Sequence, residues 1–131
     1  MKLITRDTDY AVRALCFIAG VPEKIVAVPE LVKNLKIPRP FLRKILQKLH
    51  KSGVLKAYKG KGGGFQLARA PQKIMLVDLI NIFQGPFRLN ECIFKKKICP
   101  GRSACVLKSK IDNIEQQVIR ELSNIALSSL M

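Results

Sequence analysis

The segment from residue 39 to residue 68 constrains the fold most, because its apolar pattern changes period in the middle. Up to residue 51 the apolar residues recur at helical spacing, whereas two short strand-like runs follow at residues 54–58 and 65–68. Ser52-Gly53 stands between the helical and strand-like parts, and a glycine-rich run separates the two strand-like ones. The segment therefore predicts a helix that is followed directly by a small β-hairpin.

Helical patterns account for most of the remaining chain. The apolar spacing predicts helices over residues 9–19, about 29–35, about 39–51, 76–83 and about 105–127. Thr8 or Asp9 is a suitable cap for the first of them. The order of helix, short helix, turn, basic helix and hairpin is that of a winged helix-turn-helix. We therefore expect a mainly α fold with a small β-hairpin, in which a winged helix-turn-helix is followed by a long C-terminal dimerisation helix.

The last predicted helix carries an apolar seam of its own. Its members recur at spacings of mostly three and four residues and are Leu107, Ile111, Ile114, Val118, Leu122 and Ile125. So small a chain has no obvious partner left for this seam, and a second subunit is the expected one. The alternative is that the helix folds back on its own domain.

Positive charge is concentrated in the middle of the chain. The sequence has 24 Lys and Arg against 9 Asp and Glu, which gives a formal net charge of +15. No acidic residue occurs between residues 31 and 77, although a solvated charged face usually mixes both signs. The basic residues of this stretch are Lys33, Lys36, Arg39, Arg43, Lys44, Lys48, Lys51, Lys56, Lys59, Lys61, Arg69 and Lys73. This surplus favours a polyanionic partner, nucleic acid or an anionic membrane surface, over a role in solubility alone.

Neither export nor membrane insertion is expected. Asp7, Asp9 and Arg13 interrupt the apolar run near the N-terminus, which makes a signal peptide unconvincing. No segment offers the roughly 18 consecutive apolar residues that a spanning helix needs. We therefore expect a cytoplasmic protein that binds no membrane, and whose cysteines serve metal binding or redox chemistry more readily than disulfide formation.

The basic helix over residues 39–51 is the expected reader of DNA, because a helix fits the major groove and presents its N-terminal residues to the base edges. Its candidate contacts are Arg39, Phe41, Arg43, Lys44, Lys48 and Lys51. Arg39 or Arg43 suits a forked contact to guanine, while the lysines suit phosphates. Phe41 has an alternative role in the core.

The glycine-rich run is the expected tip of the wing. Lys59, Gly60, Lys61 and Gly62 allow backbone amides to approach phosphates closely, with two cations beside them. The run matches neither glycine pattern of nucleotide-binding loops. Phe65 stands where G-x-G-x-x-G needs glycine, and the pattern G-x-x-x-x-G-K followed by Ser or Thr is absent. A DNA-contacting hairpin is therefore favoured over a nucleotide site or a simple turn.

Three of the four cysteines gather in a short segment. Cys92, Cys99 and Cys105 are spaced C-x6-C-x5-C, without the closer pairs typical of structural zinc sites. Thiolates are the usual ligands of iron–sulfur clusters, and nearby basic residues favour the thiolate form. The pattern favours such a cluster, with a thiol redox switch or a zinc site as alternatives. Cys16 lies in an apolar helical pattern and is expected to be a small buried side chain.

Several motifs together resemble the Rrf2 family of winged-helix transcription regulators along nearly the whole chain. They are M-K-L-I-T, T-D-Y-A-V-R, L-H-K-S-G at the end of the basic helix, G-K-G-G-G-F in the wing, V-D-L-I, and the three cysteines. The resemblance, which extends to IscR-like and NsrR-like members, implies a homodimer built on the long C-terminal helix. It also implies binding to palindromic promoter DNA, with the state of an iron–sulfur cluster controlling that binding.

The resemblance places the cluster ligands on Cys92, Cys99 and Cys105. The first interval is one residue longer than the family pattern, and the histidine that IscR-like members carry after the third cysteine is missing, since the only histidine is His50. NsrR-like members take a fourth ligand from the partner subunit, and the T-D-Y-A-V-R motif places it on Asp9. The alternative role of Asp9 is to cap the first helix.

The expected function is that of a DNA-binding repressor whose promoter binding is controlled by a 2Fe-2S or 4Fe-4S cluster sensing nitric oxide, redox stress or cluster supply. A regulator of the same fold without a cluster, sensing through thiols or a protein partner, is the alternative. An enzyme is not expected, because no nucleophile lies near a base and no carboxylates pair. The expected organisation is a DNA-binding domain at 1–84, a cysteine-rich cluster-binding loop at 85–104 and a dimerisation helix at 105–131, with the first helix packing across the dimer.

Overall fold

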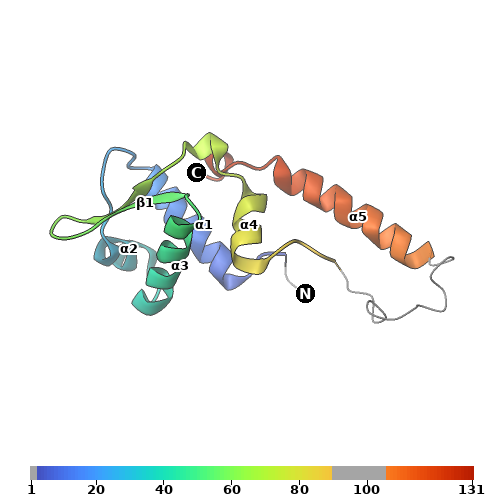
Figure 1. Cartoon of the computed structure of the whole chain (residues 1–131), viewed down its shortest axis with the longest axis horizontal. Helices are drawn as coiled ribbons and strands as arrows, with labels where there is room; N and C mark the ends of the chain where they lie inside the picture. The colour runs from blue at the N-terminus through green and yellow to red at the C-terminus, as the bar shows by residue number, and fades with distance from the viewer. Residues whose placement is uncertain (1–2, 90–105) are drawn as a thin grey trace.

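The computed structural model describes residues 3–89 and 106–131, which form helices and one β-hairpin (Figure 1). The fold class is as the sequence predicts, a mainly α winged helix-turn-helix with a long C-terminal helix. The elements in chain order are α1 (Arg6–Ala19), α2 (Val28–Leu35), α3 (Arg39–Lys51), β1 (Leu55–Tyr58), β2 (Gly64–Leu67), the 3-10 turn η1 (Pro71–Lys73), α4 (Leu76–Gln84), α5 (Val106–Ser123) and the 3-10 turn η3 (Leu127–Ser129).

Helix α1 begins three residues earlier than the apolar pattern predicts. Thr5 is its N-cap, and the Thr5 hydroxyl accepts a hydrogen bond from the backbone N–H of Thr8 at 3.5 Å. The prediction that Thr8 or Asp9 caps the helix is therefore wrong. Asp9 instead lies in the first turn, where its negative charge is favourable to the helix dipole.

The main core lies between α1, α2, α3 and the hairpin. Ala11 and Ala14 are fully buried on α1 and belong to the same core cluster as the buried leucines of α3. Leu42 and Leu46 of α3 are also fully buried, and each such side chain contributes about 1.5–3 kcal/mol relative to exposure. The apolar stripe of α3 is thus buried in the core, and the basic side of the helix is exposed.

The hairpin is fixed to the rest of the domain at its base. Strands β1 and β2 pair antiparallel, with Leu55 opposite Leu67 and Tyr58 opposite Gly64. Val26 adds a bridge on the other side of β2, exchanging two 2.9 Å backbone hydrogen bonds with Phe65. A Cβ atom at Gly64 would lie 2.3 Å from the Val26 carbonyl oxygen, so this approach requires glycine.

A second, smaller core joins α4 to the C-terminal part of α5. Ile80, Phe87 and Leu122 are its buried members. After α5 the chain runs back along the domain, where Leu127 donates a 2.7 Å backbone hydrogen bond to the Ile74 carbonyl and is 1% exposed. The predicted continuation of the helix to residue 127 is wrong, because the chain leaves it after Ser123 to make this contact.

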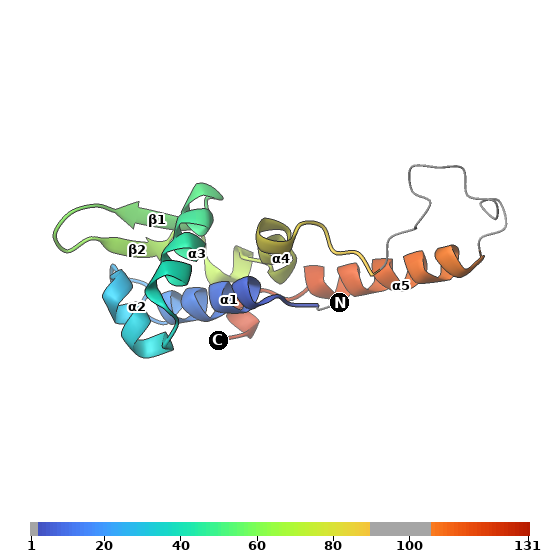
Figure 2. The same cartoon turned by 90° about the horizontal axis from the view of Figure 1, so that it is seen from below.

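The C-terminal end of the predicted seam thus packs on its own domain, whereas the beginning of α5 does not. Leu122 is buried, and Val118 and Ile125 pack against the small core. The first turns of α5 project away from the body of the molecule in both views (Figures 1 and 2), and there Leu107 is 72% exposed. The seam therefore has two parts with different environments. In the described part of the chain, no helix is long and apolar enough to cross a membrane.

Candidate nucleic-acid interface

The exposed side of α3 carries the cations that the sequence singles out. The turn before it contains Lys36 in the left-handed conformation, at φ 57°, and the buried Ile37, so the chain reverses sharply between α2 and α3. The side chains predicted to contact DNA from this helix are all exposed: Arg39, Phe41, Arg43, Lys44, Lys48 and Lys51. Within residues 3–89 and 106–131, no ion pair involves a cation of α3 or the hairpin. Their charge is therefore available to an anionic partner.

Phe41 does not join the core, which excludes the alternative role that the sequence allows. Its side chain is 39% exposed at the beginning of α3. The guanidinium carbon of Arg6 lies 4.5 Å from the centre of the Phe41 ring, a cation–π distance. The sequence did not single out Arg6, because it lies about 25 residues before the acid-free stretch of residues 31–77.

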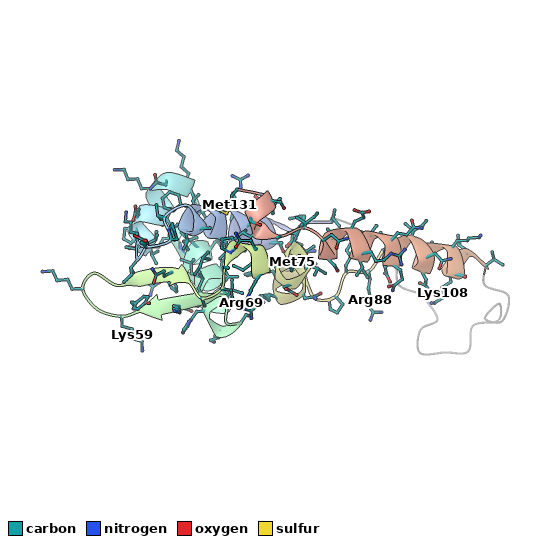
Figure 3. The ribbon with its side chains drawn as sticks, turned by 90° about the horizontal axis from the view of Figure 1, so that it is seen from above. Lys59, Arg69, Met75, Arg88, Lys108 and Met131 are labelled. Carbon is teal, nitrogen blue, oxygen red and sulfur yellow. The ribbon has the colours of Figure 1, made fainter. Side chains whose placement is uncertain are left out.

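The hairpin tip extends from the domain with its predicted contact residues exposed. Lys59, Gly60, Lys61 and Gly62 are all exposed, and Figure 3 labels Lys59 beside the loop that joins β1 and β2. Gly60 and Gly62 have φ of 86° and 77°, values that favour glycine. The tip is therefore a basic loop whose glycines leave the backbone accessible, as the predicted wing requires.

Side chains of the hairpin brace its orientation. The Tyr58 hydroxyl donates to Oε1 of Gln66 at 3.1 Å, and Nε2 of Gln66 donates to the Pro22 carbonyl at 2.9 Å. At the end of α3, Nδ1 of His50 lies 3.1 Å from the Leu55 carbonyl oxygen. The single histidine is thus a link between the basic helix and the wing.

Gln84 joins the beginning of α1 to the end of α4. Its Oε1 accepts hydrogen bonds from the Thr5 backbone N–H at 2.9 Å and from the Thr8 hydroxyl at 2.7 Å. Its Nε2 donates to the Leu3 carbonyl at 3.2 Å. The sequence contains no signal for this link, since its partners are more than 75 residues apart.

Cys92, Cys99 and Cys105, the predicted cluster ligands, lie outside the described residues. The described residue nearest to them on the N-terminal side is Leu89, whose backbone N–H donates to the Glu115 carboxylate of α5 at 2.8 Å. Among the described residues no group of three His, Cys, Asp or Glu side chains is placed to hold a metal ion. Only Asp9 of the predicted ligand set can therefore be located.

Asp9 lies on the surface of α1 and is paired within its own helix. Its carboxylate is 3.0 Å from Nε of Arg13, and its side chain is 46% exposed. An exposed ion pair at this helical spacing stabilises the helix by only about 0.2–0.5 kcal/mol, so a stronger partner of the Asp9 carboxylate would replace Arg13 at little cost. The ligand role of Asp9 remains a prediction.

Cys16 is half-buried, not fully buried as predicted. Its Sγ lies 3.9 Å from the Leu130 carbonyl oxygen, next to the C-terminal turn. Burial raises the pKa of the Cys16 thiol, so it is mostly protonated and a weak nucleophile at neutral pH. It lies on α1, in a different part of the chain from the three-cysteine segment.

A family model described as "Rrf2: Iron-dependent Transcriptional regulator" matches residues 4–131. A protein of Aquifex aeolicus assigned to the HTH-type transcriptional regulators is 35% identical over 119 residues, covering 88% of this chain and 83% of its own. "Protein aau3" of Rhizobium meliloti is 33% identical over 109 residues, covering 82% and 71% of the two chains.

Solved structures show the same fold at lower identity. CymR of B. subtilis, described as the global cysteine regulator, aligns with a TM-score of 0.77 at 20% identity, over 99% of this chain and 96% of its own. IscR of T. potens aligns with a TM-score of 0.75 at 23% identity, over 99% and 85%. At these identities the likeness concerns the fold and not the signal.

Proposed function

Because the chain belongs to the Rrf2 family of DNA-binding transcriptional regulators, which are not enzymes, we propose that it is a homodimeric repressor whose promoter binding is controlled by an iron–sulfur cluster. The observation that carries the proposal is the match to a family described as iron-dependent over residues 4–131, a range that includes all three closely spaced cysteines. The cluster would sense nitric oxide, redox stress or cluster supply.

The donor set suits such a cluster chemically. Cys92, Cys99 and Cys105 supply three thiolates, the ligand type that iron–sulfur clusters use, and Arg88, Lys95 and Arg102 add positive charge next to and within the segment. Asp9 of the partner subunit is the proposed fourth ligand, a harder and more exchangeable donor than a thiolate. When bound, the cluster would supply the redox and nitric oxide chemistry of the sensor.

The first turns of α5 support the dimer. Val106, Leu107 and Ile114 are 64%, 72% and 51% exposed, an unusual placement for three large apolar side chains on one helix. Burying a side chain of this size against a second subunit contributes about 1.5–3 kcal/mol. A dimer would also present two copies of α3 to two half-sites, which matches palindromic promoter DNA.

Anaerobic purification followed by visible absorption, iron and acid-labile sulfide analysis tests the cluster. We expect coloured protein with comparable iron and sulfide, loss of both in Cys99→Ala, and retention of both in the matched control Cys16→Ala. Colourless wild-type protein without sulfide, even after reconstitution with iron and sulfide, would contradict the proposal.

A cluster-free regulator that senses through thiols is the second candidate. It is supported by the three closely spaced cysteines themselves, because thiols near basic residues are redox-reactive without a metal. The two candidates differ in one measurement: removal of iron by a chelator changes the promoter footprint of a cluster sensor but leaves that of a thiol sensor unchanged.

A further inference from the structure

A basic hollow lies between the beginning of α1, the middle of α3 and the end of α4. It has a volume of about 360 Å³ and is lined by Arg6, Asp7, Phe41, Lys44, Ile45, Lys48 and Phe83. These residues come from three helices, and α1 lies beside both α3 and α4 in the two ribbon views (Figures 1 and 2). The hollow is therefore a product of the tertiary structure and borders the helix that is expected to read DNA.

Aromatic rings position two of its three cations. The guanidinium of Arg6 lies 4.5 Å from the Phe41 ring centre and 5.9 Å from that of Tyr10. The ammonium of Lys48 lies 5.5 Å from the Phe83 ring centre. A guanidinium held over a ring keeps its N–H donors at its edge, where an anion can accept hydrogen bonds from them.

The charge of the hollow is positive in spite of one carboxylate. Asp7 lies 3.4 Å from the Arg6 guanidinium and opposes the binding of an anion. In the described part of the chain, neither Lys44 nor Lys48 forms an ion pair with a carboxylate. Three cations against one acid leave a surplus at a place that is continuous with the exposed basic side of α3.

We propose that this hollow binds a backbone phosphate of the DNA beside the major groove that α3 enters, with Arg6 and Lys48 as its main contacts. The inference rests on the DNA binding of the proposed function and extends the interface to α1, which the sequence did not place in it. A phosphate contact positions the protein on the duplex but carries no sequence information. The site therefore contributes affinity and orientation, not choice of operator.

Salt dependence of binding to a mixed-sequence duplex of about 30 base pairs tests the site, because each phosphate contact adds about 0.9 to the slope of log K against log salt. We expect Arg6→Gln to weaken binding roughly tenfold and to lower that slope by about one. Arg120→Gln, on the exposed surface of α5, is the matched control, since it removes the same charge and is expected to leave the slope unchanged.

Asp7→Asn separates the proposed role from simple damage to α1. It removes the carboxylate that opposes an anion, so we expect tighter DNA binding, whereas general damage to the helix would weaken binding in both variants. The inference would be overturned if Arg6→Gln had the same salt slope of DNA binding as the wild type, or if Asp7→Asn bound DNA more weakly. The hollow would then bind a different ligand, such as a small anion.

All proteins are compared in one cluster state, so the outcome is independent of cluster control. Wild-type protein that fails to bind duplex DNA would contradict the proposed function itself. Wild-type binding with an unchanged Arg6→Gln slope would contradict only the phosphate site.

Discussion

Replacing Gln84 by Leu should destabilise the domain by loosening the beginning of α1 from the end of α4. The Gln84 side chain makes two part-buried hydrogen bonds, from the Thr5 backbone N–H and the Thr8 hydroxyl, and a third, exposed one to the Leu3 carbonyl. Leucine has a similar size, so the substitution removes the hydrogen bonds without opening a large cavity.

The expected loss can be worked out bond by bond. Each part-buried hydrogen bond contributes about 0.5–1.5 kcal/mol, and the exposed one contributes little. The Thr8 hydroxyl is fully buried but keeps the Thr5 hydroxyl as a partner at 3.2 Å, so it is not left without a hydrogen bond. The Thr5 N–H does lose its side-chain partner. The sum is a loss of roughly 2 kcal/mol in the free energy of unfolding.

Urea denaturation measures this loss. The protein concentration is kept fixed, because the stability of the proposed dimer would depend on it. The matched control is Asn81→Leu, an exposed position on the same helix, which should change stability by less than about 0.5 kcal/mol. Amide exchange should also become faster at Thr5 in Gln84→Leu. A loss below about 0.5 kcal/mol, or an equal loss in the control, would refute the reasoning.

Two further substitutions test the wing and α5. In Gly64→Ala the new Cβ would lie 2.3 Å from the Val26 carbonyl oxygen, so the Val26–Phe65 bridge must open. We expect the free energy of unfolding to fall by about 2 kcal/mol and DNA binding to weaken, and a variant with the same unfolding and DNA titration curves as the wild type would contradict this. Leu107→Asp combined with Ile114→Asp places two charges on the exposed apolar surface of α5 and should shift sedimentation to the monomer without lowering helix content. The matched control is Ser109→Asp combined with Asn113→Asp, which adds two charges on the opposite, exposed side of the same turns; an intact dimer in the first double variant would show that the interface lies elsewhere.

The order of elements in the winged helix-turn-helix could be predicted because its signals are local. In α3 the helical spacing of Leu42, Ile45, Leu46 and Leu49 sets both the buried stripe and, by exclusion, the basic exposed side. Ser52-Gly53 and the glycine-rich run mark the ends of the helix and strands at almost the observed positions. The charge pattern likewise depends on composition alone.

The predictions for the end of α5 and the start of α1 were wrong for different reasons. The seam pattern continues through residue 125, but backbone pairing of the C-terminal segment with residues 74–76 ends the helix at Ser123. Thr5 caps α1 in place of Thr8 or Asp9, because its hydroxyl accepts a local hydrogen bond from the Thr8 N–H, before the apolar pattern begins. At the end of α5 a periodic pattern cannot indicate the boundary, because the hydrogen bonds that decide it come from residues 74–76, far away in the chain.

What the sequence by itself determined is therefore the family, the basic helix, the hairpin and the three closely spaced thiols, because each depends on residue types and short spacings. Only the tertiary structure decided that α5 is half covered by its own domain, that Gln84 joins α1 to α4, and that Arg6 lies beside Phe41, Lys44 and Lys48. The physical reason is that these contacts depend on how helices pack, and packing brings together residues whose separation along the chain carries no pattern.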